Sequence, residues 1–258
     1  MTEAGTPPRV GLFVTCLVDI FRPNIGFASA CSLTAAGCTV EVPVRQTCCG
    51  QPNCNNGDLA GTRALAEQTI EAFERYDYVV APSGSCAAQL RKYPALFAHH
   101  PRWQRRAREL AERTHDILAF LAEIAPLERI RARYLHRVTY HDSCSSLRQL
   151  DIKQQPRRLL AHVEGLQLVE MANTEVCCGF GGTFCVKYPE ISARMVTDRV
   201  NHILASGANT VLGGDLGCLL NIAGRLRRLN KAVHVFHTVE VLANRAHRPG
   251  IAEDDNCL

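Results

Sequence analysis

Two segments of this chain carry cysteines in the same order, with a pair of adjacent cysteines followed by glycine in the middle of each. The phrase "CCG" occurs at 48–50 and again at 177–179. A single cysteine precedes the two pairs by 32 and 33 residues, and another cysteine follows each pair. The repeated positions are Cys16, Cys48, Cys49 and Cys86 in the first segment, and Cys144, Cys177, Cys178 and Cys218 in the second. Self-similarity of this kind indicates a duplicated structural unit.

Apolar runs of strand length alternate with amphipathic stretches in both segments. The runs "RVGLFVT", "CTVEVPV" and "DYVVAP" in the first segment correspond in order to "HRVTYHDS", "LQLVEM" and "NTVLGG" in the second. Stretches such as "DLAGTRALAEQTIEAFERY" and "PEISARMVTDRVNHILASG" show helical spacing of their apolar residues. This alternation predicts an α/β fold of two pseudo-twofold-related halves, each a mainly parallel sheet flanked by helices.

The chain is long enough for one large domain or two smaller ones, because it has 258 residues. We expect the first repeat over residues 9–98 and the second over 134–245. The charged stretch between them, 99–133, is expected to be a helical connector. Flexible tails are expected at 1–8 and 246–258.

The motif cysteines follow the predicted strands, and this position gives them a common location. In an open parallel sheet, binding sites lie beyond the carboxyl ends of the strands. Three parallel strands in each half would therefore bring four thiols to one edge, although these cysteines lie far apart in the sequence. We expect two such sets, one in each half, as candidate metal ligands.

Composition and charge limit the function and the compartment. The chain has 13 cysteines, an odd number, and its start shows no secretory signal. We therefore expect a cytoplasmic protein, in which free thiols serve metal binding or redox chemistry. A net charge of +4 without a basic stripe argues against nucleic-acid binding. No run of 18 apolar residues occurs, so no membrane span is expected, and peripheral association with a membrane stays open.

Four converging thiols suit more than one kind of site. Zinc is one candidate, although its usual pair of short C-x2-4-C motifs is absent from both segments. An iron–sulfur cluster is a second, since four thiolates per cluster is the common number. A switch formed by a disulfide between adjacent cysteines is a third, but it leaves the two single cysteines of each set unused.

The quoted motifs resemble those of the cysteine-rich CCG domain family. The phrases "LFVTCLVDIFRPNIG", "CCGQP", "VVAPSGSC", "CCGFGGTF" and "GCLLNIAGRL" are similar to those of its branch in lactate utilisation, and the likeness covers residues 9 to 245. The cysteine-rich component of heterodisulfide reductase is a more distant relative. The resemblance implies an iron–sulfur oxidoreductase subunit that oxidises L-lactate to pyruvate with partner proteins, including a further iron–sulfur protein.

The resemblance also implies that the eight motif cysteines hold the clusters, one of the 4Fe-4S type in each half. The sequence departs from the heterodisulfide reductase pattern, which ends in C-x-x-C. Ser83 and Asp215 occupy the first position of that motif here, so each half has four thiols rather than five. A thiol–disulfide reductase subunit and a scaffold stabilised by zinc or clusters are the alternative functions.

Several residues near the motifs have open roles. His141 precedes Cys144 at a predicted strand end, where it could bind iron, accept a proton from a hydroxy acid or donate a hydrogen bond. His141 is a candidate for a catalytic residue, and the sequence identifies no other. Cys54 and Cys185 follow their pairs closely and could be extra ligands or idle thiols. Cys31 and Cys38 are expected to be core residues. The sequence contains no nucleotide or flavin fingerprint, since no G-x-G-x-x-G follows a strand.

Overall fold

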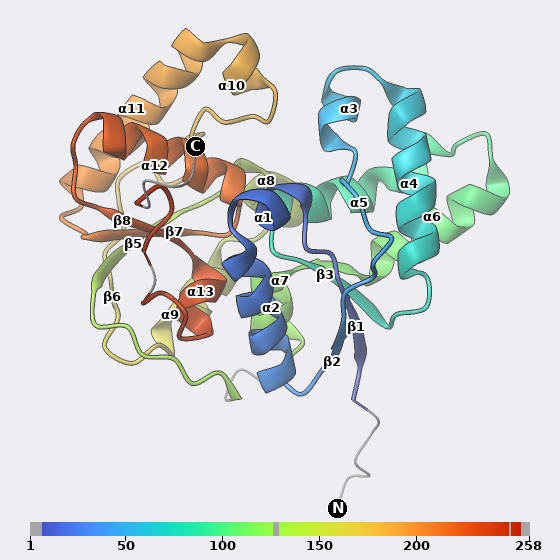
Figure 1. Ribbon diagram of the computed structural model, residues 1–258, viewed down its shortest axis with the longest axis horizontal. Coiled ribbons are helices and arrows are strands. Elements are labelled where there is room, and N and C mark those ends of the chain that lie inside the picture. The colour runs from blue at the N-terminus through green and yellow to red at the C-terminus, as the bar shows by residue number, and fades with distance from the viewer. Residues whose placement is uncertain (1–6, 126–128, 248, 254–258) are drawn as a thin grey trace, which may run out of the picture.

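Two four-stranded parallel sheets, one in each half of the chain, form the framework of the protein (Figure 1). The computed structural model describes residues 7–125, 129–247 and 249–253. Its strands are β1 (Arg9–Leu12), β2 (Thr39–Glu41), β3 (Tyr78–Ala81), β4 (Thr114–Asp116), β5 (Arg137–His141), β6 (Gln167–Leu168), β7 (Thr210–Gly213) and β8 (His234–His237). The strand order is β2-β1-β3-β4 in the first sheet and β6-β5-β7-β8 in the second, which is the same topology. The predicted α/β class with two similar halves is therefore confirmed.

All strand pairs within both sheets are parallel, so the carboxyl ends of the strands in a sheet lie at the same edge. In the first sheet Leu12 pairs with Val80, and in the second Tyr140 pairs with Leu212. The central strands β1, β3, β5 and β7 are buried over nearly their whole length, which explains their continuous apolar runs.

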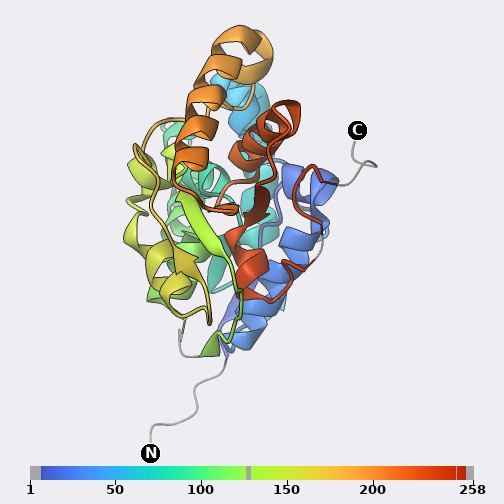
Figure 2. The same cartoon turned by 90° about the vertical axis from the view of Figure 1, so that its left-hand side faces the viewer.

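Helices cover the faces of both sheets and form most of the surface (Figures 1 and 2). They are α1 (Cys16–Phe21), α2 (Pro23–Ala35), α3 (Gln51–Asn55), α4 (Leu59–Phe73), α5 (Gly84–Leu96), α6 (Pro101–Arg113), α7 (Ile117–Glu123), α8 (Cys144–Leu150), α9 (Gln154–Ala161), α10 (Phe184–Lys187), α11 (Pro189–Ala205), α12 (Leu216–Arg228) and α13 (Thr238–Leu242). The short helices α3 and α10, which follow the two cysteine pairs, both lie at the end of the molecule away from the amino terminus.

The expected helical connector over 99–133 differs from the structure in one element. Between α6 and α7, residues Thr114–Asp116 form β4, which pairs with β3 at the edge of the first sheet. Its sequence, "THD", has no apolar run, so the local pattern gives no strand signal. Asp116 also caps α7, since its Oδ1 accepts a hydrogen bond of 2.8 Å from the Leu118 amide.

Part of the expected carboxyl-terminal tail is packed against the second sheet. Ile251 is 4 % exposed, and its amide donates a hydrogen bond of 2.9 Å to the Val235 carbonyl. Glu253 lies 2.6 Å from the Nδ1 of His234. This segment is therefore anchored to β8, while residues 1–6 and 254–258 of the expected tails lie outside the described residues.

The two halves share one hydrophobic core. Val10 and Leu12 of β1 belong to the same cluster of buried residues as Val138 and Tyr140 of β5. Helix α2 of the first half packs against α13 of the second, and α5 packs against α8. Across the described residues, every helix is too short or too polar to traverse a bilayer.

A buried ion pair joins the halves where α2 meets α13. The Glu240 side chain has no exposed surface and lies 2.9 Å from Nη2 of Arg22. The same carboxylate accepts hydrogen bonds from Asn24 Nδ2 at 2.5 Å and from the His237 amide at 3.0 Å. Three donors from both halves therefore satisfy one buried carboxylate.

Removing this carboxylate is expected to destabilise the fold. Glu240→Ala leaves the Arg22 guanidinium buried without its partner, which costs about 3–5 kcal/mol in the free energy of unfolding. Glu74→Ala is the matched control, because Glu74 is 54 % exposed in its pair with Arg106 and such pairs contribute about 1 kcal/mol or less. Urea denaturation of the variants measures both values, and equal losses would contradict the interpretation.

Candidate metal centres at the strand ends

The four predicted thiols of the first half lie together beyond the carboxyl ends of their strands. The Sγ atoms of Cys16 and Cys48 are 3.8 Å apart, and those of Cys49 and Cys86 are 3.4 Å apart. All four cysteines line one cavity of about 220 Å³. We call them the first cysteine set. Residues that are 32 to 70 positions apart in the sequence are thus neighbours in space.

The four thiols of the second half gather in the corresponding place. The Sγ atoms of Cys178 and Cys218 and a ring nitrogen of His141 all lie within 4.8 Å of one another. The Cys177 sulfur is hydrogen-bonded by the thiols of Cys144 and Cys178. These four cysteines are the second cysteine set.

The two sets differ in the cavities that their cysteines line. Cys144 and Cys218 line a cavity of about 240 Å³ between the halves. Cys177 lies instead on a separate hollow at the outer side of this half. All four cysteines of the first set therefore line one cavity, whereas Cys144 and Cys177 of the second set line different ones.

The four motif cysteines outside the adjacent pairs lie at the amino-terminal ends of helices. Cys16 is the first residue of α1 and Cys144 the first of α8. Cys86 and Cys218 lie in the first turns of the 13-residue helices α5 and α12. A helix amino terminus carries partial positive charge and free amides, so it stabilises thiolates and other anions. Each set thus receives two helix ends that favour a negatively charged occupant.

A glycine after each cysteine pair allows the backbone to turn toward the sulfur. Gly50 and Gly179 have φ values of 77° and 81°, in the left-handed region that favours glycine. Their amides each donate a hydrogen bond of 3.4 Å to the sulfur two residues earlier, on Cys48 and Cys177. A side chain at Gly179 would also collide with the Ser192 carbonyl of α11, at 2.9 Å. The "CCG" phrase is therefore a sulfur-binding turn.

One thiol in each set is ionised most easily. Hydrogen bonds from neighbouring thiols hold the pKa of Cys48 and of Cys177 far below the usual value. The thiols next to them have raised pKa values, chiefly because they donate hydrogen bonds to that sulfur, with burial as a further cause. Without a metal, each set therefore favours one thiolate, at Cys48 or Cys177, and the thiols that donate to that sulfur stay protonated.

His141 lies against the second set, and its imidazole has no hydrogen-bond partner in the described part of the chain. It is 1 % exposed, and both of its ring nitrogens are buried without a partner. Burial, aided by the nearby Arg199 guanidinium, lowers the pKa of His141 to about 3. A neutral imidazole with two unsatisfied nitrogens next to thiols is suited to bind a metal centre or donate a hydrogen bond to it.

Arg199 of α11 is a functional candidate that the motifs of the sequence did not indicate. It is fully buried, and its guanidinium lies in electrostatic contact with the second set. Nη2 donates to the carbonyl of Val176, the residue before the cysteine pair, and Nη1 lies 3.1 Å from Met171 Sδ. Its spacing from the buried Ser192 and Val196, on the core face of α11, is the signal that could have identified it.

Asp215 joins the two sets across the interface between the halves. Its Oδ2 accepts hydrogen bonds of 2.9 Å from the Ser85 amide and 3.4 Å from Ser143 Oγ. Burial raises the pKa of Asp215. The cavities next to the two sets share Asp215, Ser85, Gln51, Phe180 and Gly182 as a common wall. The two candidate centres are therefore close neighbours.

The remaining cysteines have different surroundings. Cys54 lines the cavity between the halves together with Cys144, and Cys185 donates a hydrogen bond of 3.2 Å to the Gly182 carbonyl. Cys38 is buried as expected, but the prediction for Cys31 is wrong, because it lies on the exposed face of α2. Each cysteine in the described ranges is a free thiol.

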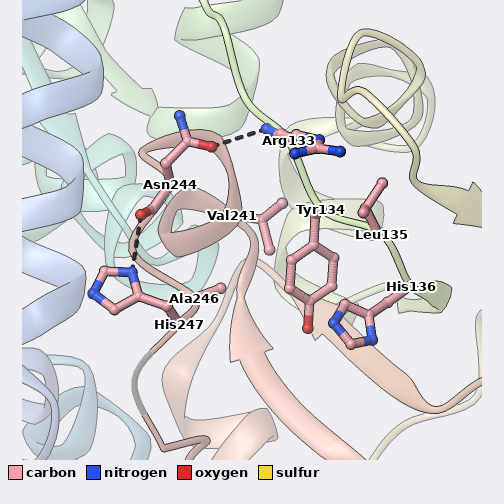
Figure 3. A pocket seen from close by; sticks show the side chains of 8 residues that line it. All are labelled: Arg133, Tyr134, Leu135, His136, Val241, Asn244, Ala246 and His247. Carbon is pink, nitrogen blue, oxygen red and sulfur yellow. Dashed lines mark hydrogen bonds between the residues drawn. The ribbon is translucent and has the colours of Figure 1, made fainter.

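A pocket at the other end of the second sheet is separate from the cysteine sets. It has a volume of about 350 Å³ and lies before β5 and beside α13 (Figure 3). The rings of Tyr134 and His136 face each other with centroids 4.4 Å apart. Asn244 Oδ1 accepts a hydrogen bond of 2.8 Å from the Arg133 amide. These contacts fasten the chain that enters β5, at the edge opposite the cysteines.

The donor set of the first half fits a polynuclear metal group. Thiols are soft ligands suited to zinc or iron–sulfur clusters. Two thiolates on one tetrahedral ion lie about 3.8 Å apart, so the sulfur separations alone admit zinc. The cavity of about 220 Å³ lined by the first set is, however, several times the roughly 30 Å³ that a water molecule occupies. The space beside the sulfurs thus accommodates a group larger than a single ion.

The fold and the site define a duplicated cysteine-rich α/β protein. Residues 10–91 and 138–223 match the cysteine-rich domain CCG, with one match in each half. The chain belongs to this cysteine-rich CCG domain family.

Curated relatives are similar over most of the chain. "Lactate utilization protein A" of Geobacillus kaustophilus is 46% identical over 237 residues, which cover 92% of this chain and 99% of that protein. The proteins of the same name from Shouchella clausii and Bacillus subtilis are 48% and 43% identical over 92% of this chain and 99% and 100% of theirs. The structure of an aspartate racemase homologue from Pyrococcus horikoshii covers 93% of this chain and 97% of its own at 12% identity, but its TM-score of 0.35 is too low to inform the fold or function.

The reduced, metal-free protein is expected to contain about two thiolates at pH 6, Cys48 and Cys177. Their pKa values lie below the ordinary value of about 8.5, so both stay ionised as the pH falls through 8.5, whereas the neighbouring thiols stay protonated. Thiolate absorbance near 240 nm measures this number. It should fall by half in Cys48→Ser, stay unchanged in Cys31→Ser and vanish on unfolding in denaturant. A signal that appears only above pH 8 would contradict the assignment.

Proposed function

We propose that this protein is an iron–sulfur electron-transfer subunit in the oxidation of L-lactate to pyruvate. The observation that carries the proposal is the gathering of two sets of four free thiols, two of each set at helix amino termini. A 4Fe-4S cluster in each half, held by the first and the second cysteine set, is the occupant that we propose. Such clusters accept and release single electrons.

The chain's own residues have defined parts in this proposal. The eight thiols are the ligands, and the amides of Gly50 and Gly179 stabilise negative charge on sulfur. The four helix ends favour the anionic cluster. Phe180 and Asp215 of the second half line the cavity that the first set also lines. His141 stays the candidate catalytic residue.

The substrate is proposed from the relatives, which bear the name "Lactate utilization protein A". Oxidation of lactate to pyruvate releases two electrons and two protons. Two one-electron centres match this number of electrons, but the sequence has no nucleotide or flavin fingerprint with which to take a hydride. We therefore propose that the chain acts with partner subunits, including a further iron–sulfur protein, and is inactive on lactate alone. We place this system in the cytoplasm.

Metal analysis tests the cofactor. Protein purified without oxygen is expected to contain iron and acid-labile sulfide in equal amounts, with about eight iron atoms per chain. Cys48→Ser and Cys177→Ser should each lose about half of the iron, because each removes a ligand from one set. Cys31→Ser, which alters an exposed thiol outside both sets, should keep the full content. Stoichiometric zinc without sulfide would overturn the proposal in favour of a zinc-stabilised scaffold.

Growth on L-lactate tests the substrate. A deletion strain without another lactate dehydrogenase should fail to grow on L-lactate and still grow on pyruvate. The intact gene should restore growth, a Cys16→Ser/Cys144→Ser gene should not, and a Cys31→Ser gene should. Unimpaired growth of the deletion strain would remove lactate as the substrate. Loss of thiol–disulfide reduction in its place would support the heterodisulfide-type alternative.

A further inference from the structure

The two halves have the same framework but differ at a buried position beside the cysteine sets. The registers pair Val10 with Tyr78 in the first sheet and Val138 with Thr210 in the second. Phe13 lies three residues after Val10, and His141 lies three residues after Val138. These two residues therefore occupy corresponding positions in the two halves. Both are fully or almost fully buried. Where the first half has an apolar ring, the second half therefore has an imidazole.

A second difference lies on the helices that follow the cysteine pairs. The buried residues of α4 are Thr62, Ala66, Thr69, Ile70 and Phe73, and those of α11 are Ser192, Val196, Arg199, Val200 and Ile203. The two series have identical spacing, which aligns Thr69 with Arg199. Thr69 donates a hydrogen bond of 2.8 Å to the Leu65 carbonyl of its own helix. A neutral hydroxyl in the first half is thus replaced by a cation in the second.

The charge of Arg199 is not balanced by a paired carboxylate. Within the described ranges no acidic side chain forms an ion pair with it, and its Nε has no partner. The nearby Asp142 carboxylate is instead held by Arg157 through two hydrogen bonds of 2.9 Å. A buried cation without a counter-ion is costly. An anionic group held by the second set would provide the missing negative charge.

The outer hollows next to the two sets also differ in the charges of the residues that line them. The hollow beside Cys16 and Cys48 has one charged lining residue, Asp19. The hollow beside Cys177 is lined by three basic residues and two acidic ones, which are Arg148, Lys153, Arg157, Glu170 and Glu175. The lining of the hollow beside the second set is therefore more positive than the lining of the hollow beside the first. Asp215 lines the cavities of both sets, and its carboxylate acts on Cys144 of the second.

We propose that His141 and Arg199 make the centre in the second cysteine set the more easily reduced of the two. Reduction adds one negative charge, which a nearby buried cation stabilises by Coulomb attraction. Nitrogen ligation and hydrogen bonds to cluster sulfur also raise the reduction potential. Phe13 and Thr69 supply neither effect to the first set. This inference rests on the proposed function, because it requires an iron–sulfur centre in each half.

This difference in reduction potential favours electron transfer from the first centre to the second. When one electron passes from the first centre to the second, the first centre is oxidised and the second is reduced. No bond or proton is transferred. At equilibrium the electron then resides at the second set. His141 and Arg199 are in this sense positioning residues, since they act on the potential of a centre that the cysteines hold.

A redox titration of the full chain, purified without oxygen and followed by electron paramagnetic resonance, tests the inference. Cys16→Ser and Cys144→Ser assign the two transitions, because each variant loses one centre. We expect the transition that is lost in Cys144→Ser to have the more positive potential. Arg199→Gln and His141→Phe should each move this transition to a more negative potential and leave the other unchanged.

Matched variants separate charge from packing. Arg199→Lys keeps the positive charge, so the reduction potential of the second centre should stay close to its original value. Thr69→Val, at the corresponding place in the first half, should move neither transition. Iron and sulfide contents of all variants show whether both centres are still present. If Arg199→Gln does not fold, His141→Phe, which introduces the residue found in the first half, gives the same test.

Each outcome supports or overturns the inference. Equal potentials, a more positive first centre, or an unchanged potential in both Arg199→Gln and His141→Phe would overturn it while the proposed function stands. A chain with only one centre would overturn it too, together with the proposal of a cluster in each half. A chain without iron and sulfide would overturn this inference and the proposed function together.

Discussion

The convergence of strand ends and helix ends on the cysteine sets is the constraint on which the rest of the structure depends. Parallel strands place the residues that follow them at one edge, and the following helices begin there. Sulfurs from distant parts of the chain thus approach to 3.4 and 3.8 Å in the first set. Four thiolates at this spacing would repel one another. The amino termini of α1 and α5, and of α8 and α12, supply positive potential that offsets this repulsion and favours an occupied site whose overall charge is negative.

Duplication of the unit produces two sites that share ligands but not surroundings. The cysteines, the glycine turns and the helix ends recur in both halves, because they belong to the framework. Side chains that face the sulfurs from the core do not recur, as the pairs Phe13 with His141 and Thr69 with Arg199 illustrate. The Asp215 carboxylate accepts a hydrogen bond from the Ser85 amide of the other half, so this position joins the halves.

The sites are enclosed by the protein yet reachable from two sides. Two adjoining cavities lie between the halves, one beside each set, and outer hollows approach Cys48 in the first half and Cys177 in the second. Burial strengthens the electrostatic effect of each nearby charge, because the interior screens charges less than water does. The same burial makes Arg199 and His141 influential, since each has buried nitrogen atoms without a partner in the described residues.

The sequence by itself determined the duplicated α/β framework and the eight thiols that converge, because periodicity and the repeated cysteine order are local signals. The tertiary structure alone decided what surrounds them. The strand Thr114–Asp116 has no apolar run and forms only because β3 offers an edge with which to pair. Cys31 looked like a core residue but lies on the solvent side of α2. Arg199 belongs to an ordinary amphipathic pattern, and its importance depends on which side chains pack opposite it. Such contacts join residues distant in sequence, so no local pattern encodes them.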